Sequence, residues 1–276
     1  LIPYTIDQLF NNGYLFSDFD TICPQGPSEF KWAREFHNIP EKKIKRLGSL
    51  YFRSIDLTLA RDSTNPVAGK RKTLRLMYAG STATYFPTTS EFQGLDALLV
   101  ARDKGILNNT EITYRPVGES PQIRKLIESR FSGIECLRIQ YPSAISIGLD
   151  TYDPMDTAKS LREHVRAIRE IDLLVMAGFT SLCLEMAYLG APSISFYSDP
   201  SGTLEKRSTR LFIDSSKANS WFESIPIVMS NDELILMVQS LLTNPKKRQE
   251  IAKDIVDTWD YKNADTEKIL VESIFF

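Results

Sequence analysis

The sequence has no hydrophobic stretch long enough to cross a membrane, because no apolar run approaches the roughly 18 residues that a spanning helix needs. Histidine is scarce. His37 and His164 are the only two, so there is no histidine cluster of the kind that binds zinc. The three cysteines, Cys23, Cys136 and Cys183, are widely spaced and form no C-x-x-C pair. That usage is typical of reduced thiols in a cytoplasmic protein.

A strong net charge is also absent. The 33 Lys and Arg residues nearly balance the 35 Asp and Glu residues, so the net charge of −2 gives no overall field that would favour nucleic acid as a partner. What the chain does have is length and apolar content. With 276 residues, 42% of them hydrophobic, it can form one large or two modest globular domains.

The most informative segment reads as a strand, a turn, a short helix and a second strand. The apolar run Leu173–Ala177 predicts a buried strand, and the helix is expected at Ser181–Leu189, with the next strand at Ser193–Tyr197. The turn between the first strand and the helix contains Gly178, Thr180 and Ser181. A turn of this kind presents free backbone N–H groups at a helix N-terminus, where phosphates commonly bind.

Glu185 lies about one turn inside this otherwise apolar helix. A carboxylate in such surroundings needs a partner, which a sugar diol beside a bound phosphate would supply. The alternative is an ordinary strand–helix–strand unit with a capped helix, whose Glu185 reaches solvent.

The spacing Glu185-x-x-x-x-Gly190-x-Pro192 resembles the nucleotide-sugar-binding segment of GT-B glycosyltransferases. The resemblance implies that the turn faces the donor diphosphate and that Glu185 binds the ribose hydroxyls. It also implies a reaction without a protein-bound metal or cofactor, in which backbone amides and basic residues neutralise the leaving diphosphate.

Short apolar strands alternate with amphipathic helices from Leu74 onward, which predicts an α/β fold: a Rossmann-like parallel sheet with helices on both faces. The expected strands are Leu74–Ala79, Glu111–Arg115, Glu135–Ile139, Leu173–Ala177, Ser193–Tyr197 and Ile225–Met229. The expected helices are Thr88–Lys104, Pro121–Phe131, Thr157–Glu170, Ser181–Leu189, Asp232–Leu242, Pro245–Trp259 and Asp265–Ile274. Ligands of such sheets bind at the carboxyl ends of the strands.

Two further segments follow strand ends and are therefore expected at the same edge. Gly80 and Ser81 come directly after the first strand, and in the resembled family this loop approaches the donor phosphates. Arg115 ends the second strand, where its guanidinium could pair with a diphosphate. The alternatives are a simple hydroxyl-rich turn and a surface arginine bonded to the next loop. The candidate donor-nucleotide residues are thus Gly80, Ser81, Arg115, Gly178, Thr180, Ser181 and Glu185.

Three other polar features are expected to have structural rather than functional roles. The aspartates of the segment 150–156 precede a helix and are expected to cap it rather than bind a metal. His164 lies in a charged helical stretch and is expected at the surface. Arg207 and Arg210 are expected to be solvated helix residues, with contact to donor or acceptor as the alternative.

The expected domain organisation has three parts. Residues 1–60, which include expected helices at Thr5–Phe16 and Pro27–His37, resemble the end of the N-terminal domain of GT-B enzymes and the interdomain linker, with a polar connection at Asp62–Lys72. Residues 61–260 form the donor-binding domain, and residues 261–276 form a helix that packs back on the first segment. Because the chain has neither an initiator Met nor a signal peptide, we expect a fragment whose N-terminal part is missing.

The resemblance implies a glycosyltransferase that moves a sugar from a nucleotide-sugar donor to a cell-surface polysaccharide or glycolipid acceptor. Peripheral association with a membrane is compatible with such an acceptor, and no nucleic acid is expected as a partner. A nucleotide-sugar 2-epimerase is the first alternative, although it needs carboxylates and histidines in the cleft, and histidine is scarce here. A non-catalytic nucleotide-binding or scaffolding domain is the second alternative.

Overall fold

The computed structural model describes residues 21–24, 26–35, 37–61, 73–80, 88–116, 121–141, 154–197 and 224–259. The chain divides into two compact units, one formed by residues 1–62 with 253–276 and the other by residues 63–252. None of the described helices has the length and apolar character required to cross a bilayer.

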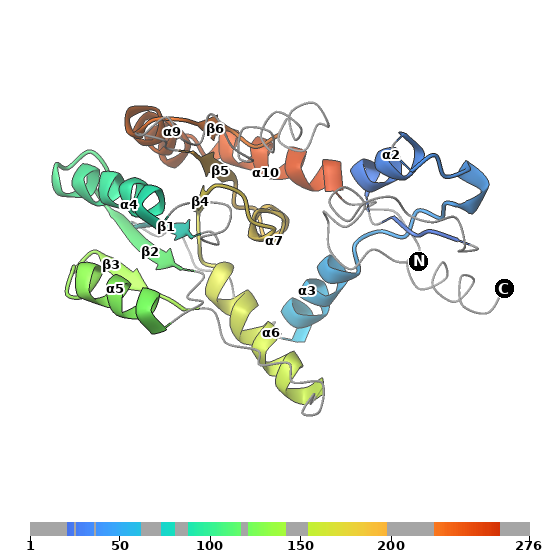
Figure 1. The fold of residues 1–276 in the computed structure, drawn as a ribbon, viewed down its shortest axis with the longest axis horizontal. Coiled ribbons are helices and arrows are strands. Elements are labelled where there is room, and N and C mark those ends of the chain that lie inside the picture. Colours follow the sequence, from blue (N-terminus) through green and yellow to red (C-terminus); the bar gives the residue numbers. More distant parts are fainter. Residues whose placement is uncertain are drawn as a thin grey trace. The chain divides into compact units, whose positions relative to one another are not determined.

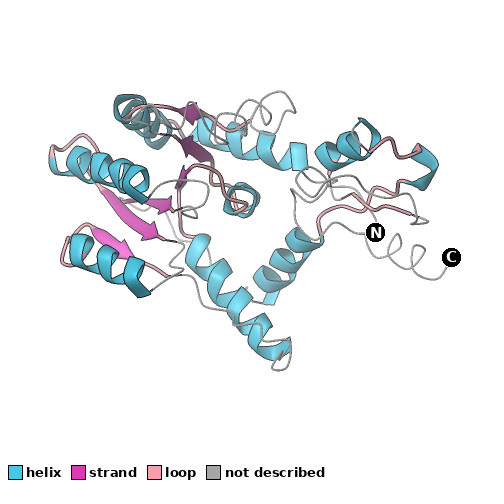
Figure 2. Ribbon diagram, viewed as in Figure 1, coloured by secondary structure: helices cyan, strands magenta, loops and turns pink. Residues whose placement is uncertain are grey.

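The larger unit is built on a six-stranded parallel sheet (Figures 1 and 2). The strands run in the order β3-β2-β1-β4-β5-β6, which is the strand order of doubly wound nucleotide-binding sheets. The chain builds outward from β1 to β3 and then crosses to β4, so the strand order reverses between β1 and β4. Their bounds are β1 Leu74–Ala79, β2 Thr110–Arg115, β3 Leu137–Ile139, β4 Leu173–Ala177, β5 Ser193–Phe196 and β6 Ile227–Val228.

Helices cover both faces of this sheet. In Figure 1, α4 (Thr88–Asp103), α5 (Pro121–Phe131) and α9 (Asn231–Thr243) lie over one face, and α6 (Pro154–Ile168) and α7 (Leu182–Tyr188) lie over the other. The central strands are buried on both sides, with all five residues of β4 below 2% exposure. This double burial explains why the central strands read as continuous apolar runs rather than alternating ones.

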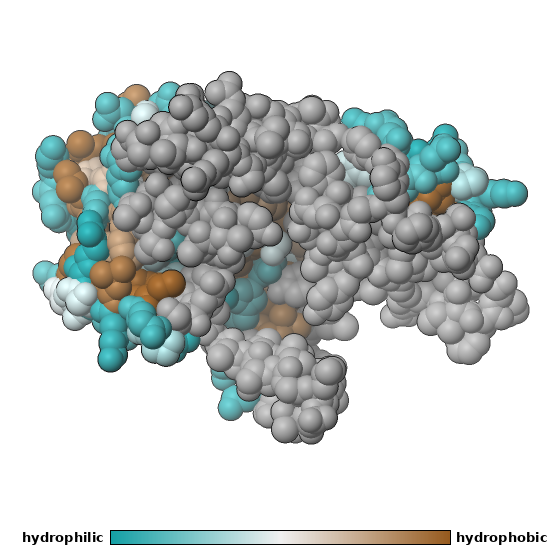
Figure 3. All heavy atoms as spheres, in the orientation of Figure 1, coloured by the Kyte–Doolittle hydropathy of each residue, from teal (hydrophilic) through white to brown (hydrophobic). Residues whose placement is uncertain are grey.

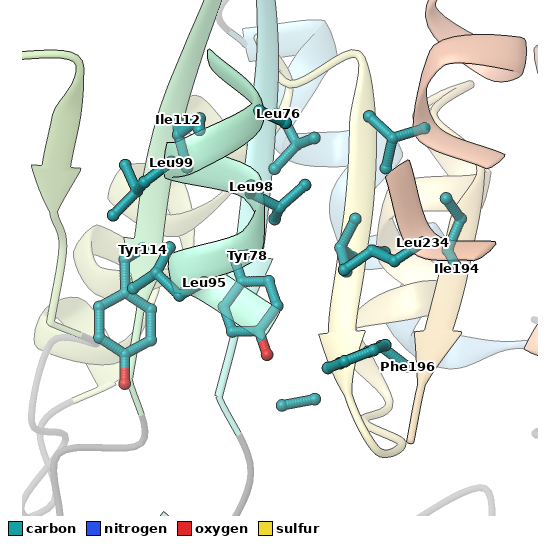
Figure 4. Close-up of a cluster of buried hydrophobic side chains, with 14 of the residues drawn as sticks. Leu76, Tyr78, Leu95, Leu98, Leu99, Ile112, Tyr114, Ile194, Phe196 and Leu234 are labelled. Atoms are coloured by element: carbon teal, nitrogen blue, oxygen red, sulfur yellow. The ribbon is translucent and has the colours of Figure 1, made fainter. Parts of the chain in front are cut away.

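The main core fills the layer between the sheet and α4. Leu95, Leu98 and Leu99 point from α4 toward side chains of β1, β2 and β5, as Figure 4 shows. Gly94 permits this close approach, because a Cβ there would lie 2.5 Å from Phe196 Cε1 and would also collide with the Tyr78 hydroxyl. Outside this layer, Val100, Ile106 and Leu126 reach the surface of α4, the turn after it and α5. Figure 3 shows hydrophobic residues among hydrophilic ones on that side.

The amino ends of β1 and β4 are held together by polar contacts. The backbone N–H of Arg75 donates to Asp172 Oδ2 at 2.8 Å, and the Arg75 guanidinium pairs with Glu111 and Glu170. These contacts fix the register in which Leu76 opposes Leu173. At the carboxyl ends, Ala79 therefore lies opposite Met176, and β4 extends one residue beyond β1.

The smaller unit contributes α2 (Pro27–Glu35), the 3₁₀ helix η1 (Glu41–Lys43) and α3 (Leu50–Arg61) to the described residues. Ile22 and Ile44 form an isolated parallel bridge. Helix α3 was not among the expected elements. α10 (Pro245–Trp259) agrees with its expected bounds.

The α/β sheet expected from the sequence is confirmed, with shifts at several element ends. Strands β3 and β6 are shorter than expected, and α6 begins at Pro154 and ends at Ile168 rather than spanning Thr157–Glu170. The expected helices Thr5–Phe16 and Asp265–Ile274, the connection Asp62–Lys72, and Arg207 and Arg210 lie outside the described residues, as do residues 150–153 of the aspartate-rich segment.

Candidate functional site

Two polar clusters occupy the carboxyl edge of the sheet, one on each face. Successive side chains of a strand point to opposite faces. At the end of β2, Tyr114 therefore belongs to the core layer under α4, whereas Arg115 faces the side covered by α6 and α7. The three strands that carry the candidate residues, β1, β2 and β4, are neighbours in the sheet.

Arg115, His164 and Glu185 form the cluster on the α6/α7 side. Arg115 Nη2 lies 3.1 Å from His164 Nδ1, and His164 Nε2 contacts Glu185 Oε2. The side chains of His164 and Glu185 are only 18% and 15% exposed. Residues from β2, α6 and α7, separated by up to 70 positions in the chain, are thus joined by consecutive hydrogen bonds.

This cluster corrects the expectation for His164 and adds a partner for Glu185 within the protein. His164 is not a surface residue but the centre of the cluster, since it sits in the same helical register as the partly buried Leu161 and the buried Ile168. Glu185 does need a partner, but His164 supplies one within the protein. Glu185 Oε1 makes no hydrogen bond with any described residue, so one carboxylate oxygen remains available to a ligand.

The turn after β4 is tightly held at Gly178. Its φ of +79° lies in the left-handed region that favours glycine. Its N–H donates to the Phe196 carbonyl at 2.8 Å, and its carbonyl accepts from the Ser195 hydroxyl at 2.5 Å. The N–H groups of Thr180 and Ser181 have no hydrogen-bond partner among the described residues.

Gly80 lies at the neighbouring strand end, as expected from the βα order. Its N–H is already used, because it donates to the Arg115 carbonyl at 2.9 Å. A Cβ at Gly80 would lie 2.8 Å from Glu91 Cδ and closer still to Glu91 Oε1, so a larger residue at this position would require the Glu91 carboxylate to move. Ser81 lies outside the described residues.

Glu91, Tyr78 and Tyr114 form the second cluster, which the sequence reasoning missed. The Tyr114 hydroxyl donates to the Glu91 carboxylate, and the Tyr78 hydroxyl donates to the Glu91 carbonyl at 2.7 Å. Glu91 is only 5% exposed. Burial raises the pKa of both phenols well above the usual range, and the Glu91 carboxylate raises each pKa further. The available signal was a glutamate in the first turn of α4, the helix that follows β1 in the chain.

Cys183 lies two residues before Glu185 in α7 and is fully buried. Burial raises the pKa of its thiol, and the nearby Glu185 carboxylate raises that pKa further. The thiol is therefore protonated and unsuited to nucleophilic chemistry. Within the described ranges, no group of three His, Cys, Asp or Glu side chains is placed to hold a metal ion.

The sequence matches no family model and no curated protein. Solved structures match with low identity. UDP-GlcNAc 2-epimerase from Neisseria meningitidis, bound to UDP-GlcNAc, matches with a TM-score of 0.62 and 12% identity, over 92% of this chain and 61% of that one. MnaA from S. aureus in complex with UDP matches with a TM-score of 0.60 and 7% identity, over 91% of this chain and 59% of that one. A variant of the wall teichoic acid polymerase TagF, soaked with CDPG, matches with a TM-score of 0.51 and 13% identity, over 92% of this chain and 55% of that one.

The fold is of the GT-B type. Identities this low show the fold alone, and this chain spans between 55% and 61% of the length of those three proteins. These neighbours are enzymes, and two of their structures contain UDP or UDP-GlcNAc.

Proposed function

We propose that this chain binds a nucleotide-sugar at the carboxyl edge of its sheet and forms the donor-binding part of a glycosyltransferase. The observation that carries the proposal is the gathering of Arg115 and Glu185 around His164, beside the point where the strand order reverses. That position is where doubly wound sheets hold nucleotides. The acceptor of the sugar would be a cell-surface polysaccharide or a glycolipid.

The site residues divide between the ribose and the phosphates. Glu185 Oε1 would accept a hydrogen bond from a ribose hydroxyl. Arg115 would pair with the diphosphate and stabilise the negative charge that develops as it leaves the anomeric carbon. The N–H groups of Thr180 and Ser181 would donate to the same phosphates, while Gly80, Ser81 and Gly178 would shape the backbone around them.

Binding can be tested by thermal denaturation with UDP, CDP, GDP and ADP. A ligand that binds only the native state raises stability by RT ln(1 + [L]/Kd), about 2.7 kcal/mol at a hundredfold excess over Kd. One nucleotide should therefore raise the melting temperature by several degrees, and Arg115→Ala should remove most of this rise. If none of the four nucleotides shifts a cooperative transition, the proposal is wrong.

A nucleotide-sugar 2-epimerase is the second candidate function. Two observations favour it: the 2-epimerase from N. meningitidis has a higher TM-score than TagF, and the His164–Glu185 pair supplies a histidine and a carboxylate side by side. Proton NMR of UDP-GlcNAc incubated with the protein separates the reactions. Inversion at C2 of the sugar supports epimerisation, whereas an unchanged C2, with the sugar joined to an added glycan acceptor and free UDP released, supports transfer.

A further inference from the structure

His164 is the link between the two groups that the proposed function assigns to the nucleotide. It contacts Arg115 through Nδ1 and Glu185 through Nε2, on opposite sides of its ring. No other described residue touches both Arg115 and Glu185 through hydrogen bonds. The roles of the two ring nitrogens follow from the chemistry of these partners.

The hydrogen-bond partners of His164 determine which of its ring nitrogens carries the proton. An arginine guanidinium only donates hydrogen bonds, and an ionised carboxylate only accepts them. Nδ1 must therefore carry its lone pair toward Arg115, and Nε2 must carry the hydrogen that it donates to Glu185. A hydrogen on Nδ1 instead would face an N–H of Arg115 and would leave Nε2 as an acceptor against the carboxylate.

This arrangement fixes how Glu185 presents itself to a ligand. Its Oε2 is held by the Nε2–H donor, and the carboxylate plane is thereby oriented. Its Oε1 is left without a described hydrogen-bond partner. Because only about 15% of the side chain is exposed, a ligand hydroxyl can approach the carboxylate from a narrow range of directions.

We propose that His164 is the positioning residue of the nucleotide site, which aims Glu185 at the ribose by donating from Nε2. The inference rests on the proposed function, since it concerns the recognition of the ribose at that same site. His164 touches neither ribose nor phosphate in this role. It acts through Glu185, and it ties that carboxylate to the phosphate-facing Arg115.

The test compares each of UDP, CDP, GDP and ADP with its 2′,3′-dideoxy form by calorimetric titration of the full chain. For the nucleotide that binds most tightly, the Kd of the dideoxy form divided by the Kd of the ordinary form measures the recognition of the ribose hydroxyls. For the wild type we expect a ratio on the order of tenfold to a hundredfold, because hydrogen bonds to charged groups are involved. A purely structural defect would weaken both forms equally and leave the ratio unchanged.

Two amide variants separate the two sides of the ring. In His164→Gln the amide nitrogen occupies the region of Nε2 and can still donate to Glu185, whereas in His164→Asn the amide oxygen occupies the region of Nδ1. We expect Gln to keep most of the ratio and Asn to reduce it to within about threefold of one. Glu163→Gln, an exposed position on the same helix, is the matched control and should leave the ratio unchanged.

A measurement on the unmodified protein covers the case in which these variants do not fold. The chain has only two histidines, so ¹⁵N NMR of the imidazoles resolves His164 once His37→Gln assigns the other ring. We expect protonated Nε2 and unprotonated Nδ1. The opposite tautomer overturns the proposal. So does a wild-type Kd ratio near one, or a loss of affinity in His164→Asn that is equal for the two nucleotide forms. Failure of the wild type to bind any nucleotide instead overturns the proposed function itself.

Discussion

At the scale of single residues, the proposed recognition of the ribose depends on the surroundings of Glu185. The carboxylate is mostly buried, and the contact with His164 compensates part of the cost of placing a charge in an apolar helix. The contact leaves one oxygen for an incoming hydroxyl. An ionised carboxylate is suited to this task because it accepts hydrogen bonds and donates none.

Glu185→Gln should therefore weaken nucleoside diphosphate binding while the fold is retained. The amide can offer its single oxygen either to His164 or to the ribose, and it loses the charge that strengthens both bonds. We expect affinity to fall roughly tenfold to a hundredfold, because hydrogen bonds to charged groups contribute about 1.5–3 kcal/mol. Calorimetric titration measures the change, with Glu163→Gln as the control. Equal affinities of the variant and wild type would remove Glu185 from the ribose.

The sequence could predict part of this site. Arg115, Gly178 and Glu185 lie where the sequence places them, at or just beyond the carboxyl ends of β2 and β4, because strand ends and the Glu-x-x-x-x-Gly-x-Pro spacing are local patterns. His164 was missed because its role depends on the packing of α6 against α7, which local pattern does not contain. The available signal was that His164 shares a helix face with Ile168 and not with the charged residues beside it.

At the scale of elements, the packing of α4 on the sheet depends on one glycine. Gly94 faces Tyr78 and Phe196, and the space where a Cβ would stand is already filled by their rings. The close approach also allows the Tyr78 hydroxyl to reach the carbonyl of Glu91. Glycine lowers the intrinsic stability of the helix at this position, and the close packing that it allows offsets this cost.

Gly94→Ala should lower the free energy of unfolding. Alanine is favoured over glycine in a helix by about 1 kcal/mol, but overpacking a filled core costs typically about 1–3 kcal/mol and disrupts the Tyr78 hydrogen bond, worth about 1 kcal/mol. The net loss should be on the order of 1–3 kcal/mol. Urea denaturation measures it. Val100→Ala, at an exposed position of the same helix, should change stability by less than about 0.5 kcal/mol. A stabilised Gly94→Ala would contradict the packing described for α4.

Most of the sheet was predictable because its signals are local. Buried strands such as β1 and β4 are short apolar runs between turn residues, and their bounds agree with the sequence prediction. Helix α3 was missed although it had readable signals. The Ser49 hydroxyl accepts from the Phe52 N–H at 3.3 Å, and Phe52 and Ile55 repeat at helical spacing. A capping serine before that spacing predicts a helix start.

At the scale of the whole molecule, the larger unit buries several weak acids. Burial raises the pKa of Tyr197 to about 12, and it also raises the pKa of Tyr78, Tyr114 and Cys183. All four lie within residues 63–252. The folded unit therefore keeps protons at pH values at which the unfolded chain, with ordinary pKa values of about 8.5 for Cys and 10 for Tyr, releases them.

The stability of this unit should fall as the solution becomes alkaline. The contribution is fully present below the unfolded pKa values and is lost as pH rises above them, since the unfolded state then binds fewer protons than the folded state. Each group contributes up to about 1.4 kcal/mol per pH unit, so the loss between about pH 8 and pH 10.5 should be on the order of 4 kcal/mol. Urea unfolding at the two pH values measures it.

Cys183→Ala is the control for this alkaline effect. It removes the acid with the lowest unfolded pKa, so it should reduce the pH dependence by about half without removing the contribution of the phenols. An unchanged pH dependence in the variant would show that the Cys183 thiol is not protected in the folded state.

The opposite orientations of Tyr114 and Arg115 also constrain how this chain can change in length. A strand alternates its faces with a period of two, so deleting one residue between Thr110 and Tyr114 would exchange their sides. The guanidinium would then enter the apolar layer under α4, and the phenol would replace it beside His164. Among natural relatives, we therefore expect insertions and deletions to avoid the stretch Thr110–Arg115 or to occur there in steps of two. A single missing codon would cost more than any one substitution in this strand.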